Sequence, residues 1–574
     1  MKLIKEYNKN ITKFTIIGLL TFTSLVKAQP GSLDLSFNGN GKFISGSIGN
    51  SESVALQSNG KIILGGSLFS SSWAFGVKRC NTNGTIDNTF GINGSTVIDI
   101  NPNLDFGRAI AIQTDDKIVI AGQSDNGSND DVTVVRLNSN GTIDNTFGTN
   151  GIVTTTISSF SEKASAIAIQ PDGKIVVGGS ANTGTSSDFI IIRYNTNGTL
   201  DNTFGVNGIV LTDIGLASDD QIKTIDLQSD GKIVAGGIYN ASGYDFCLVR
   251  YNTNGTIDNT FGNAGKVITA ITSGVDEIES IDVQSDGKIV VVGNSNITAN
   301  TDFVLVRYNT TGSLDNTFGN LGIVTTTVGL GGDYASSVKI QTNGKIVVMG
   351  YIQVGADNDA AIVRYNSNGT LDNTFGLGGK VISPIGSTYD FVLDGILDNN
   401  GKIILSGNFD NSMGAARFIG ECNLNTSVAV SGLNLTSNQI GTYQWLNCAN
   451  AMAQILNETN QTYTATTNGS YAVQITNNGC IDTSVCINIV NVGINERTRD
   501  IDFGLFPNPS NGIFNLILPN PSRIILINML GQQIQNQMYG EGLHQFDLLN
   551  QASGVYFIKV ISENKQQSIK LIKE

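Results

Sequence analysis

The sequence predicts an all-β fold, in which a seven-bladed β-propeller is followed by two smaller β-domains. Three observations carry this prediction. Only 14% of the 574 residues are charged while 67 are glycine, which is typical of short strands joined by tight turns. Two short phrases alternate seven times along the first three quarters of the chain. The period then ends near residue 421, and different β-patterns follow. At this length, two to four domains are expected.

The first residues predict an export signal. A basic start precedes a mostly apolar run, Phe14–Val26, and small residues at Val26 and Ala28 stand at the −3 and −1 positions before Gln29. We therefore expect a signal peptide over residues 1–28. No cysteine stands directly after the expected cleavage point, which argues against a lipoprotein anchor. No later stretch approaches 18 apolar residues, so no transmembrane segment is expected. The basic residues of the start are Lys2, Lys5, Lys9 and Lys13.

The repeat has two landmarks in every copy. One is a phrase close to Gly-Thr-Ile-Asp-Asn-Thr-Phe-Gly, and the other has the form Gln-x-Asp-Gly-Lys-Ile-Val. The phenylalanines of the first lie 53 and then five times 57 residues apart: Phe37, Phe90, Phe147, Phe204, Phe261, Phe318 and Phe375. The lysines of the second are Lys61, Lys117, Lys174, Lys232, Lys288, Lys345 and Lys402. Seven copies in strict alternation indicate seven equivalent structural units over residues 29–421.

Each unit is predicted to form four short antiparallel strands. In the fifth, 278–284 alternates, Ser285-Asp286-Gly287 is a hairpin turn, and the strands 288–293, 303–308 and 323–328 follow. Four-stranded sheets that bury both faces against their neighbours are the blades of a propeller. A linear solenoid is the alternative, but it requires terminal caps that the sequence lacks. A lone strand at 42–45 is expected to complete the last blade outside Ala416–Ile419 and so to close the ring.

These residues resemble the delta-60 repeat proteins and, less closely, the propellers of the NHL type, whose blades share the strand-Asp-Gly-strand hairpin and a Phe-Gly turn. The resemblance covers about residues 31–421. It implies a propeller, and it implies no reaction.

Two polar positions recur in every unit. The functional interpretation would make them seven equivalent ligand sites, whereas the structural interpretation is an Arg–Asp pair that satisfies a buried turn in each blade. Because binding sites usually break such symmetry, we favour the structural interpretation. The arginine ends the third strand: Arg79, Arg136, Arg193, Arg250, Arg307, Arg364 and Arg417. The aspartate opens the turn: Asp34, Asp87, Asp144, Asp201, Asp258, Asp315 and Asp372.

Residues 422–492 show a different β-pattern. Trp445, followed by Tyr471 in an alternating run, resembles the core strands of immunoglobulin-like modules, which implies an Ig-like β-sandwich that serves as a spacer or stalk. Four cysteines fall in this segment, Cys422, Cys448, Cys480 and Cys486, and they suit disulfides in an oxidising compartment. Their three possible pairings stay open. The remaining cysteines, Cys80 and Cys247, stand alone in strands and are expected to be buried free thiols.

A polar linker over 493–502 precedes the last predicted domain, 503–574. Three phrases mark this domain: Phe506-Pro507-Asn508-Pro509, then Asn528-Met529-Leu530-Gly531, then Gly554-Val555-Tyr556-Phe557. Their order and spacing resemble the type A C-terminal sorting domain of type IX secretion. The resemblance implies a small β-sandwich that binds the type IX secretion machinery, and an exported protein that reaches the outer cell surface or the extracellular space. The alternative is a plain terminal β-domain.

The sequence argues against most catalytic chemistry. The single histidine, His544, lies in the predicted sorting domain, which excludes His-dependent triads and the usual zinc ligands from the propeller. A formal charge of −14 argues against a nucleic-acid partner. No cofactor and no metal is expected. The candidate ligand-binding residues are Asp226, Asp282 and Lys339, which stand on inner strands where earlier units have alanine. A salt bridge between adjacent blades is the structural alternative for Asp282 and Lys339.

Two functions are compatible with these observations. The first is a secreted or surface-exposed, non-catalytic binding or adhesion scaffold with an unknown extracellular ligand, a glycan or a protein. The second is a secreted carbohydrate-active hydrolase or lyase that uses carboxylates at the propeller channel. The lack of histidine favours the first, so the sequence predicts no enzyme.

Overall fold

The computed structural model describes residues 30–574 except 216–217, 241–242, 297–299, 422–423, 478–479, 491–502 and 563–564. The predicted signal peptide (1–28), Cys422 and the predicted linker (493–502) lie outside the described residues. The described chain is almost entirely β-structure, as predicted, with a single 3-10 turn, η1 (Cys448–Asn450). None of its helices is long and apolar enough to cross a membrane.

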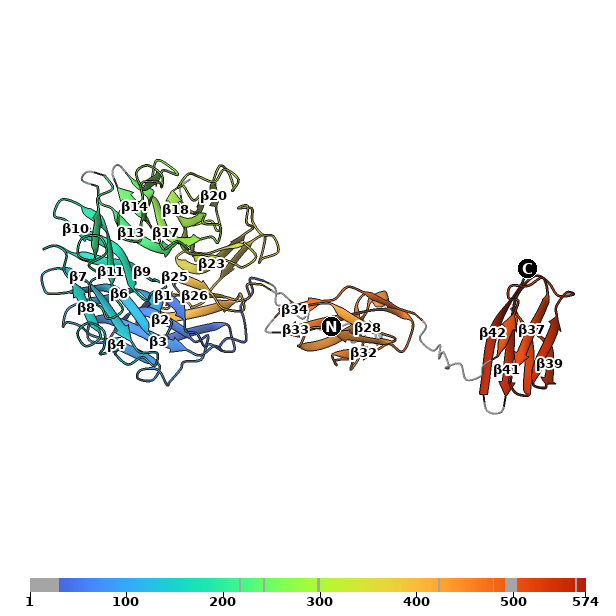
Figure 1. Ribbon diagram of the computed structural model, residues 1–574. Coiled ribbons are helices and arrows are strands. Elements are labelled where there is room, and N and C mark those ends of the chain that lie inside the picture. The colour runs from blue at the N-terminus through green and yellow to red at the C-terminus, as the bar shows by residue number, and fades with distance from the viewer. Residues whose placement is uncertain are drawn as a thin grey trace, which may run out of the picture.

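Residues 30–421 form a set of antiparallel sheets arranged around a common centre (Figure 1). Five sheets have four strands each, paired in chain order from the centre outward. They are β5 (Asp105–Ile112), β6 (Ile118–Asp125), β7 (Asp130–Leu137), β8 (Ile152–Thr155); β9 (Glu162–Ile169), β10 (Ile175–Asn182), β11 (Ser187–Tyr194), β12 (Ile209–Thr212); β13 (Gln221–Leu227), β14 (Ile233–Asn240), β15 (Tyr244–Tyr251), β16 (Lys266–Thr269); β17 (Asp276–Val283), β18 (Ile289–Asn296), β19 (Thr301–Tyr308), β20 (Ile323–Thr326); and β21 (Asp333–Ile340), β22 (Ile346–Val354), β23 (Asp357–Tyr365), β24 (Lys380–Ser383).

The two ends of the propeller share one sheet of seven strands. It contains β25 (Asp390–Leu397), β26 (Ile403–Phe409), β27 (Ser412–Phe418), β1 (Lys42–Leu56), β2 (Ile62–Phe69), β3 (Trp73–Cys80) and β4 (Ser95–Ile98), in that order. The first half of β1 pairs with β27, with Lys42 opposite Ala416, and its second half pairs with β2, with Leu56 opposite Ile62. The predicted closure by residues 42–45 is therefore confirmed.

The closing strand differs from the prediction in one respect. Residues 42–45 were expected to form a separate strand, but β1 runs without interruption from the outer edge of one blade to the inner edge of the next. The pairing of β1 with β27 is irregular between Ile44 and Ile48, and Gly46 in this stretch has φ +65°. A glycine adopts this backbone angle without steric cost, so the chain bends here and stays a strand.

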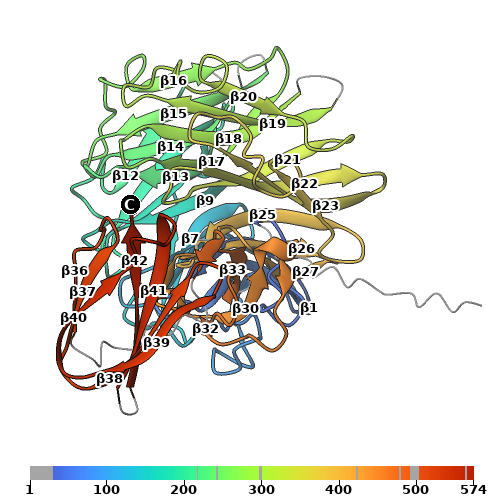
Figure 2. The same cartoon turned by 90° about the vertical axis from the view of Figure 1, so that its right-hand side faces the viewer.

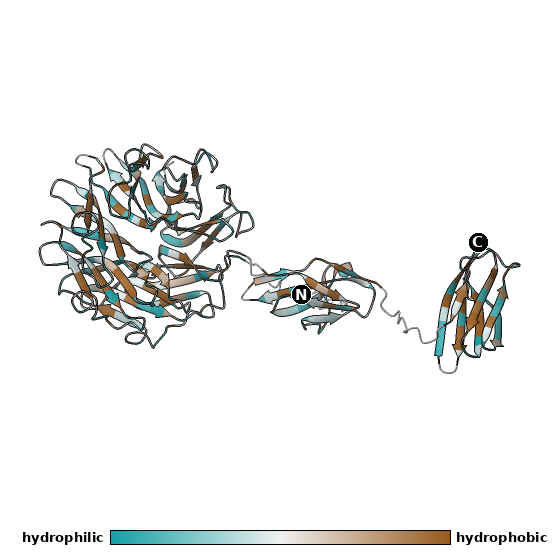
Figure 3. Ribbon diagram, in the orientation of Figure 1, coloured by the Kyte–Doolittle hydropathy of each residue, from teal (hydrophilic) through white to brown (hydrophobic). Residues whose placement is uncertain are grey.

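The inner strands complete the ring in the described residues. Each of β1, β5, β9, β13, β17, β21 and β25 contacts the next, and β25 contacts β1. Seven buried apolar clusters fill the space between successive sheets, and each cluster draws residues from two of them. Burial on both faces explains why the strands are nearly continuous in Ile and Val, visible as the apolar stretches of Figure 3.

A second β-unit follows the propeller. One sheet contains β28 (Val428–Ser431), β29 (Asn434–Ser437) and β32 (Thr462–Thr464); the other contains β31 (Ala453–Gln454), β30 (Thr442–Asn447), β33 (Gly469–Asn477), β34 (Cys480–Thr483) and β35 (Ile487–Ile489). Trp445 is fully buried in its core, and its Nε1 donates to Asn460 O at 2.9 Å. The Tyr471 hydroxyl donates to Thr467 O, four residues upstream, at 2.7 Å. The immunoglobulin-like assignment stays a prediction, which these two buried side chains support.

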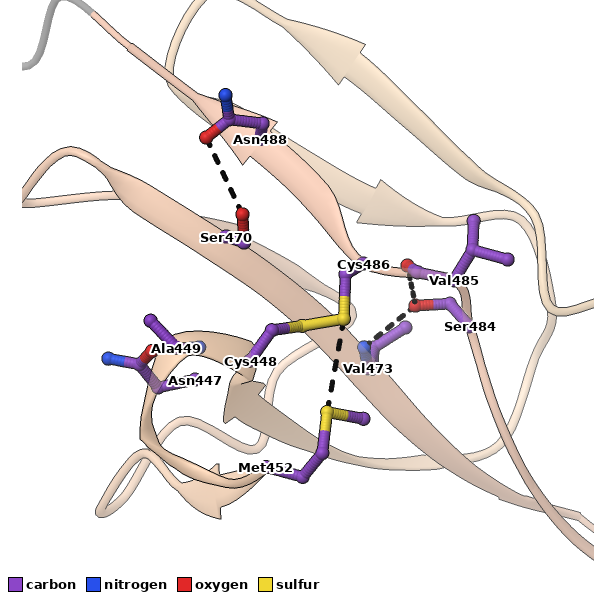
Figure 4. Close-up of a disulfide and its surroundings, with 10 residues drawn as sticks. All are labelled: Asn447, Cys448, Ala449, Met452, Ser470, Val473, Ser484, Val485, Cys486 and Asn488. Carbon is purple, nitrogen blue, oxygen red and sulfur yellow. Dashed lines mark hydrogen bonds between the residues drawn. A yellow bond between two sulfur atoms is a disulfide. The ribbon is translucent and has the colours of Figure 1, made fainter.

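The structure settles part of the disulfide pairing that the sequence left open. Cys448, in η1, is joined to Cys486, just before β35 (Figure 4). Cys480 is also disulfide-bonded. Cys80 and Cys247 are buried free thiols.

The C-terminal unit consists of two small sheets that enclose one apolar core (Figure 2). The first contains β36 (Gly504–Phe506), β37 (Ile513–Leu518) and β40 (Gly542–Asp547). The second contains β39 (Gln533–Tyr539), β38 (Ser522–Asn528), β41 (Gly554–Ser562) and β42 (Lys565–Lys573). The strands alternate between buried and exposed residues, as in β37, so each sheet has one face toward the core and one toward solvent.

Candidate ligand site in the central channel

The repeated Arg and Asp residues meet within each unit of the ring. The arginine Nε lies 2.7–2.8 Å from Oδ2 of the aspartate in all seven units. The lysine of the hairpin phrase reaches the same Oδ2 at 2.7–3.2 Å. Each buried carboxylate therefore binds two cations, of which the sequence analysis paired only the arginine.

The arginine also joins each unit to the next. In the second blade, Nη1 of Arg136 donates to the carbonyl oxygen of Thr196, 60 residues further on, and its guanidinium lies 4.6 Å from the centre of the Phe147 ring. Burial alone would raise the pKa of Asp144, but hydrogen bonds from Thr146 and Lys117 and the charge of Arg136 hold the pKa well below its usual range. Because every blade repeats these contacts, they build the scaffold and distinguish no ligand site.

The inner strands each carry one β-bulge, and the bulged residues differ from blade to blade. The pairing register with the second strand shifts by one residue in all seven. A bulge turns one extra side chain away from the regular alternation. Here the extra side chains all line a cavity of about 590 Å³ at the centre of the ring. They are Glu52, Arg108, Ser165, Lys223, Glu279, Ser336 and Leu393.

The channel is charged with both signs. Glu52 and Arg108 form an ion pair at 3.3 Å. Burial raises the pKa of Glu279 to about 7; the charge of Lys223 opposes this rise and the charge of Glu277 adds to it. Among the described residues, Lys223 makes no ion pair within 4.0 Å. Glu279 and Lys223 are both half-buried and line the cavity.

The three predicted ligand residues line the same cavity. Asp226 Oδ2 accepts a hydrogen bond from Val283 N at 2.8 Å, and Asp282 Oδ2 accepts one from Ile340 N at 2.6 Å. Each carboxylate thus bridges its own inner strand to the next one. Burial raises the pKa of Asp282 to about 6. The charge of Lys339 opposes this rise, and the charge of Asp226 adds to it.

Lys339 completes this group. Its ammonium forms no ion pair within 4.0 Å with Asp226 or Asp282, so the salt bridge considered from the sequence does not account for it. The structure therefore brings the three predicted residues together, with both carboxylates holding backbone amides and with Lys339 facing the cavity.

An aromatic cluster near the channel was missed by the sequence analysis. The rings of Tyr334 and Tyr351 are stacked with their centres 5.0 Å apart, and Tyr351 contacts Phe391 edge-on at 5.2 Å. Tyr389, which is 47% exposed, stacks on Phe391 at 6.2 Å. Burial raises the pKa of Tyr351 to about 12, and the neighbouring Tyr334 and Glu279 add to it, so the cluster lies within electrostatic reach of the channel carboxylate. Tyr334 and Phe391 occupy equivalent positions of β21 and β25, which is the signal that could have identified them.

Sequence comparison identifies two known families in the chain. Six segments match the family described as "Domain of unknown function (DUF5122) beta-propeller": residues 57–90, 113–147, 170–204, 228–261, 284–318 and 341–375. Residues 504–574 match the "Secretion system C-terminal sorting domain". The chain therefore carries β-propeller repeats and the sorting tail of type IX secretion, which marks proteins exported to the cell surface or the extracellular space. No curated protein matches the chain in sequence.

Solved structures of propeller proteins resemble the fold. A polysaccharide lyase, Uly1, is 12% identical over 69% of this chain and 98% of its own, with a TM-score of 0.40. YCF48 from Cyanidioschyzon merolae is 8% identical over 65% of this chain and 98% of its own, with a TM-score of 0.37. Sqt1 from Chaetomium thermophilum is 11% identical over 68% of this chain and 98% of its own, also with a TM-score of 0.37. At these TM-scores, none of them carries an argument about function.

Proposed function

We propose that this exported propeller protein is a non-catalytic binding scaffold whose extracellular ligand occupies the central channel. The observation that carries the proposal is where the seven units differ. The Arg–Asp–Lys group is the same in every blade, whereas the bulged residues that face the channel include two acids, two bases, two serines and a leucine. A repetitive scaffold with one varied, concave and charged surface is the arrangement expected of a selective binding site.

The chemistry of the channel favours a hydroxyl-rich or anionic ligand. Lys223 and Lys339 offer ammonium donors without ion-pair partners in the described chain, and Glu279 offers a carboxyl group. The aromatic cluster at Tyr334 and Tyr351 adds flat apolar faces, on which sugar rings pack. A glycan fits this combination of groups.

Glycan-array binding of the full-length exported protein tests the proposal. We expect selective binding that falls at least tenfold in Lys223→Ala and in Tyr334→Ala. The matched control is Asp115→Asn, a change of an exposed hairpin carboxylate outside the channel, which should bind as the wild type does. Binding that both Lys223→Ala and Tyr334→Ala retain would contradict the channel as the ligand site.

A carbohydrate-active hydrolase or lyase is the second candidate, and one observation favours it. The pKa values of Glu279, about 7, and Asp282, about 6, are in the range that suits proton transfer near neutral pH. Incubation with acidic polysaccharides, followed by product analysis, separates the two functions. Turnover that is lost in Glu279→Gln and in the double variant Asp226→Ala/Asp282→Ala would replace the binding function with a catalytic one.

A further inference from the structure

Three carboxylates converge at the junction between the sheet β9–β12 and the sheet β13–β16. Asp188 lies in β11, Asp213 follows β12 directly, and Asp220 precedes β13. One oxygen of each lies within 4.8 Å of an oxygen of the others. Two oxygens that bind the same calcium ion at 2.3–2.6 Å are at most about 5 Å apart, so the three side chains could share one ion.

The most buried member of this group has an oxygen without a hydrogen bond. Asp220 is fully buried; its Oδ2 accepts from Ile214 N at 3.1 Å and from Ser218 Oγ at 3.0 Å, whereas its Oδ1 has no hydrogen-bond partner. A buried carboxylate oxygen left unbonded is costly, and a cation is one of the few groups that can compensate it.

The equivalent aspartates of later blades do not share this feature. Asp276 binds Ile271 N, Thr272 N and Ser295 Oγ through its two oxygens. In Asp390, Oδ2 accepts from Ile385 N and Oδ1 from Gly386 N. In these two later blades, amides or hydroxyls thus satisfy both oxygens, whereas Asp220 keeps one oxygen open.

Within the described residues, the full set of three carboxylates occurs at this junction alone. Asp99 stands at the position of Asp213 in the first blade, but Ala74 replaces Asp188 there. Ala270 stands at the position of Asp213 in the following blade, and Thr156 stands there in the preceding one. Asp131 and Glu162, at the preceding junction, thus form a pair and no triad, although each also has one unbonded oxygen. Asp188, Asp213 and Asp220 form the one group of three potential metal ligands found in the described residues.

The surrounding charges leave this group strongly negative. Asp219 adds a fourth carboxylate, which accepts from Ser187 N at 2.9 Å. The nearby cation, Lys266, donates to the backbone oxygens of Asp213 and Ile214 and forms no ion pair within 4.0 Å with the carboxylates. Burial raises the pKa values of Asp188 and Asp220, with the neighbouring carboxylates adding to the rise, so a divalent cation would relieve both costs.

We propose that Asp188, Asp213 and Asp220 bind one calcium ion, which ties two adjacent blades together. Carboxylate oxygens from three separate segments are the hard, flexible ligand set that Ca²⁺ prefers, and the remaining positions are open to water. Exported proteins meet calcium outside the cell, where modules of this kind bind it with a Kd on the order of 10⁻⁴–10⁻³ M. This calcium site shares no residue with the lining of the channel cavity, so the proposal does not depend on the proposed channel ligand.

Calcium-dependent melting of the full-length protein, first treated with chelator, tests this proposal. At pH 7.5, calcium at about 10 mM should raise the Tm of the propeller by about 2–4 °C, and chelator should reverse the rise. Asp188→Asn and Asp220→Asn should abolish the response, and isothermal titration should show the loss of one binding site. Asn keeps the shape of the side chain, so these variants are expected to fold.

The matched control is Asp245→Asn, which changes the same position in the next blade, beside Asp276 and without a third carboxylate. This variant should keep the full response. A wild type without a calcium response, or a response that Asp188→Asn and Asp220→Asn retain, would overturn the proposal. So would a Tm that rises on acidification and is indifferent to calcium, since the carboxylates would then share a proton. A larger effect of Mg²⁺ than of Ca²⁺ would overturn the assignment of the ion.

Discussion

Asp34 and Arg417 are 383 positions apart in the chain, yet Oδ2 of the aspartate lies 2.7 Å from Nε of the arginine. Lys402 reaches the same oxygen at 2.7 Å. In the other six units the aspartate follows its arginine by eight residues, whereas here the aspartate comes from the opposite end of the propeller. The repeated ion pair of the blades thus becomes, at one place, a clasp between the two ends of the ring.

We expect Asp34→Asn to destabilise the propeller by about 3–5 kcal/mol, because it leaves two buried cations without their anion. Chemical denaturation of the propeller measures the loss. Asp258→Asn removes the same contacts inside a single sheet and is the matched comparison. An equal loss in both variants would mean that ring closure depends on the pairing of β1 with β27 alone. A loss below about 1 kcal/mol in Asp34→Asn would contradict the clasp.

The seven repeated aspartates predict sensitivity to acid. Their pKa values are lowered in the folded protein, so they stabilise it above the unfolded pKa of 3.8, and this contribution is lost as the pH falls through the folded pKa. The free-energy cost of Asp144→Asn should therefore be full at pH 6 and shrink progressively below about pH 4. Thermal melts of wild type and variant from neutral to acidic pH test this; a cost that is independent of pH would contradict it.

The contribution of Glu279, in the channel, to the stability of the fold should depend on pH in the opposite direction. Its pKa is raised from 4.5 to about 7, so the folded state favours the protonated form, and the destabilisation grows as the pH rises from 4.5 through 7. Glu279→Gln should therefore raise the Tm by about 1–3 °C at pH 8 and leave it unchanged near pH 4. An increase of the same size at both pH values would show that packing, and not ionisation, is responsible.

The disulfide predicts that the second β-unit depends on oxidation. Cys448 and Cys486 close a loop across 38 positions, which corresponds to about 2–4 kcal/mol of stabilisation. Calorimetry of the double variant Cys448→Ser/Cys486→Ser should show a lower transition for this unit and an unchanged transition for the propeller. The propeller serves as internal control because its cysteines, Cys80 and Cys247, are free thiols. A shift of both transitions would contradict the independence of the two units.

The sorting domain predicts where a truncated protein accumulates. Deletion of 503–574 removes the whole segment that matches the sorting family. We expect the truncated protein to stay in the periplasm, as judged by cell fractionation, with the full-length protein as the control. Delivery of the truncation to the cell surface would refute export through this domain.

The propeller could be predicted from the sequence repeat, because phrases that recur about every 57 residues indicate structural units of that length. The Arg–Asp pairing followed from the same periodicity. The role of the lysines did not, because Lys61 and Asp87 meet only once a hairpin and a turn have been folded against one another. The pairing of Cys448 with Cys486 required the register of β30 and β33, which composition cannot supply.

The candidate site was predicted in part for a similar reason. Asp226, Asp282 and Lys339 were found by comparing equivalent positions of the repeat, and all three line the channel. The bulged residues, Glu279 among them, were missed because a β-bulge has no sequence signature and reverses the alternation from which facing residues are inferred. The aromatic cluster was missed because its rings come from two blades.

The continuous strand β1 also sets the order in which the molecule can be completed. The first half of β1 can pair only after β27 has been synthesised, more than 360 residues later in the chain. Until then a chain emerging from its amino end has one sheet with an unfinished edge, exposed to any other strand in the compartment. The ring can therefore close only after β27 has been made, and a nascent chain that stalls before residue 412 cannot reach the closed state.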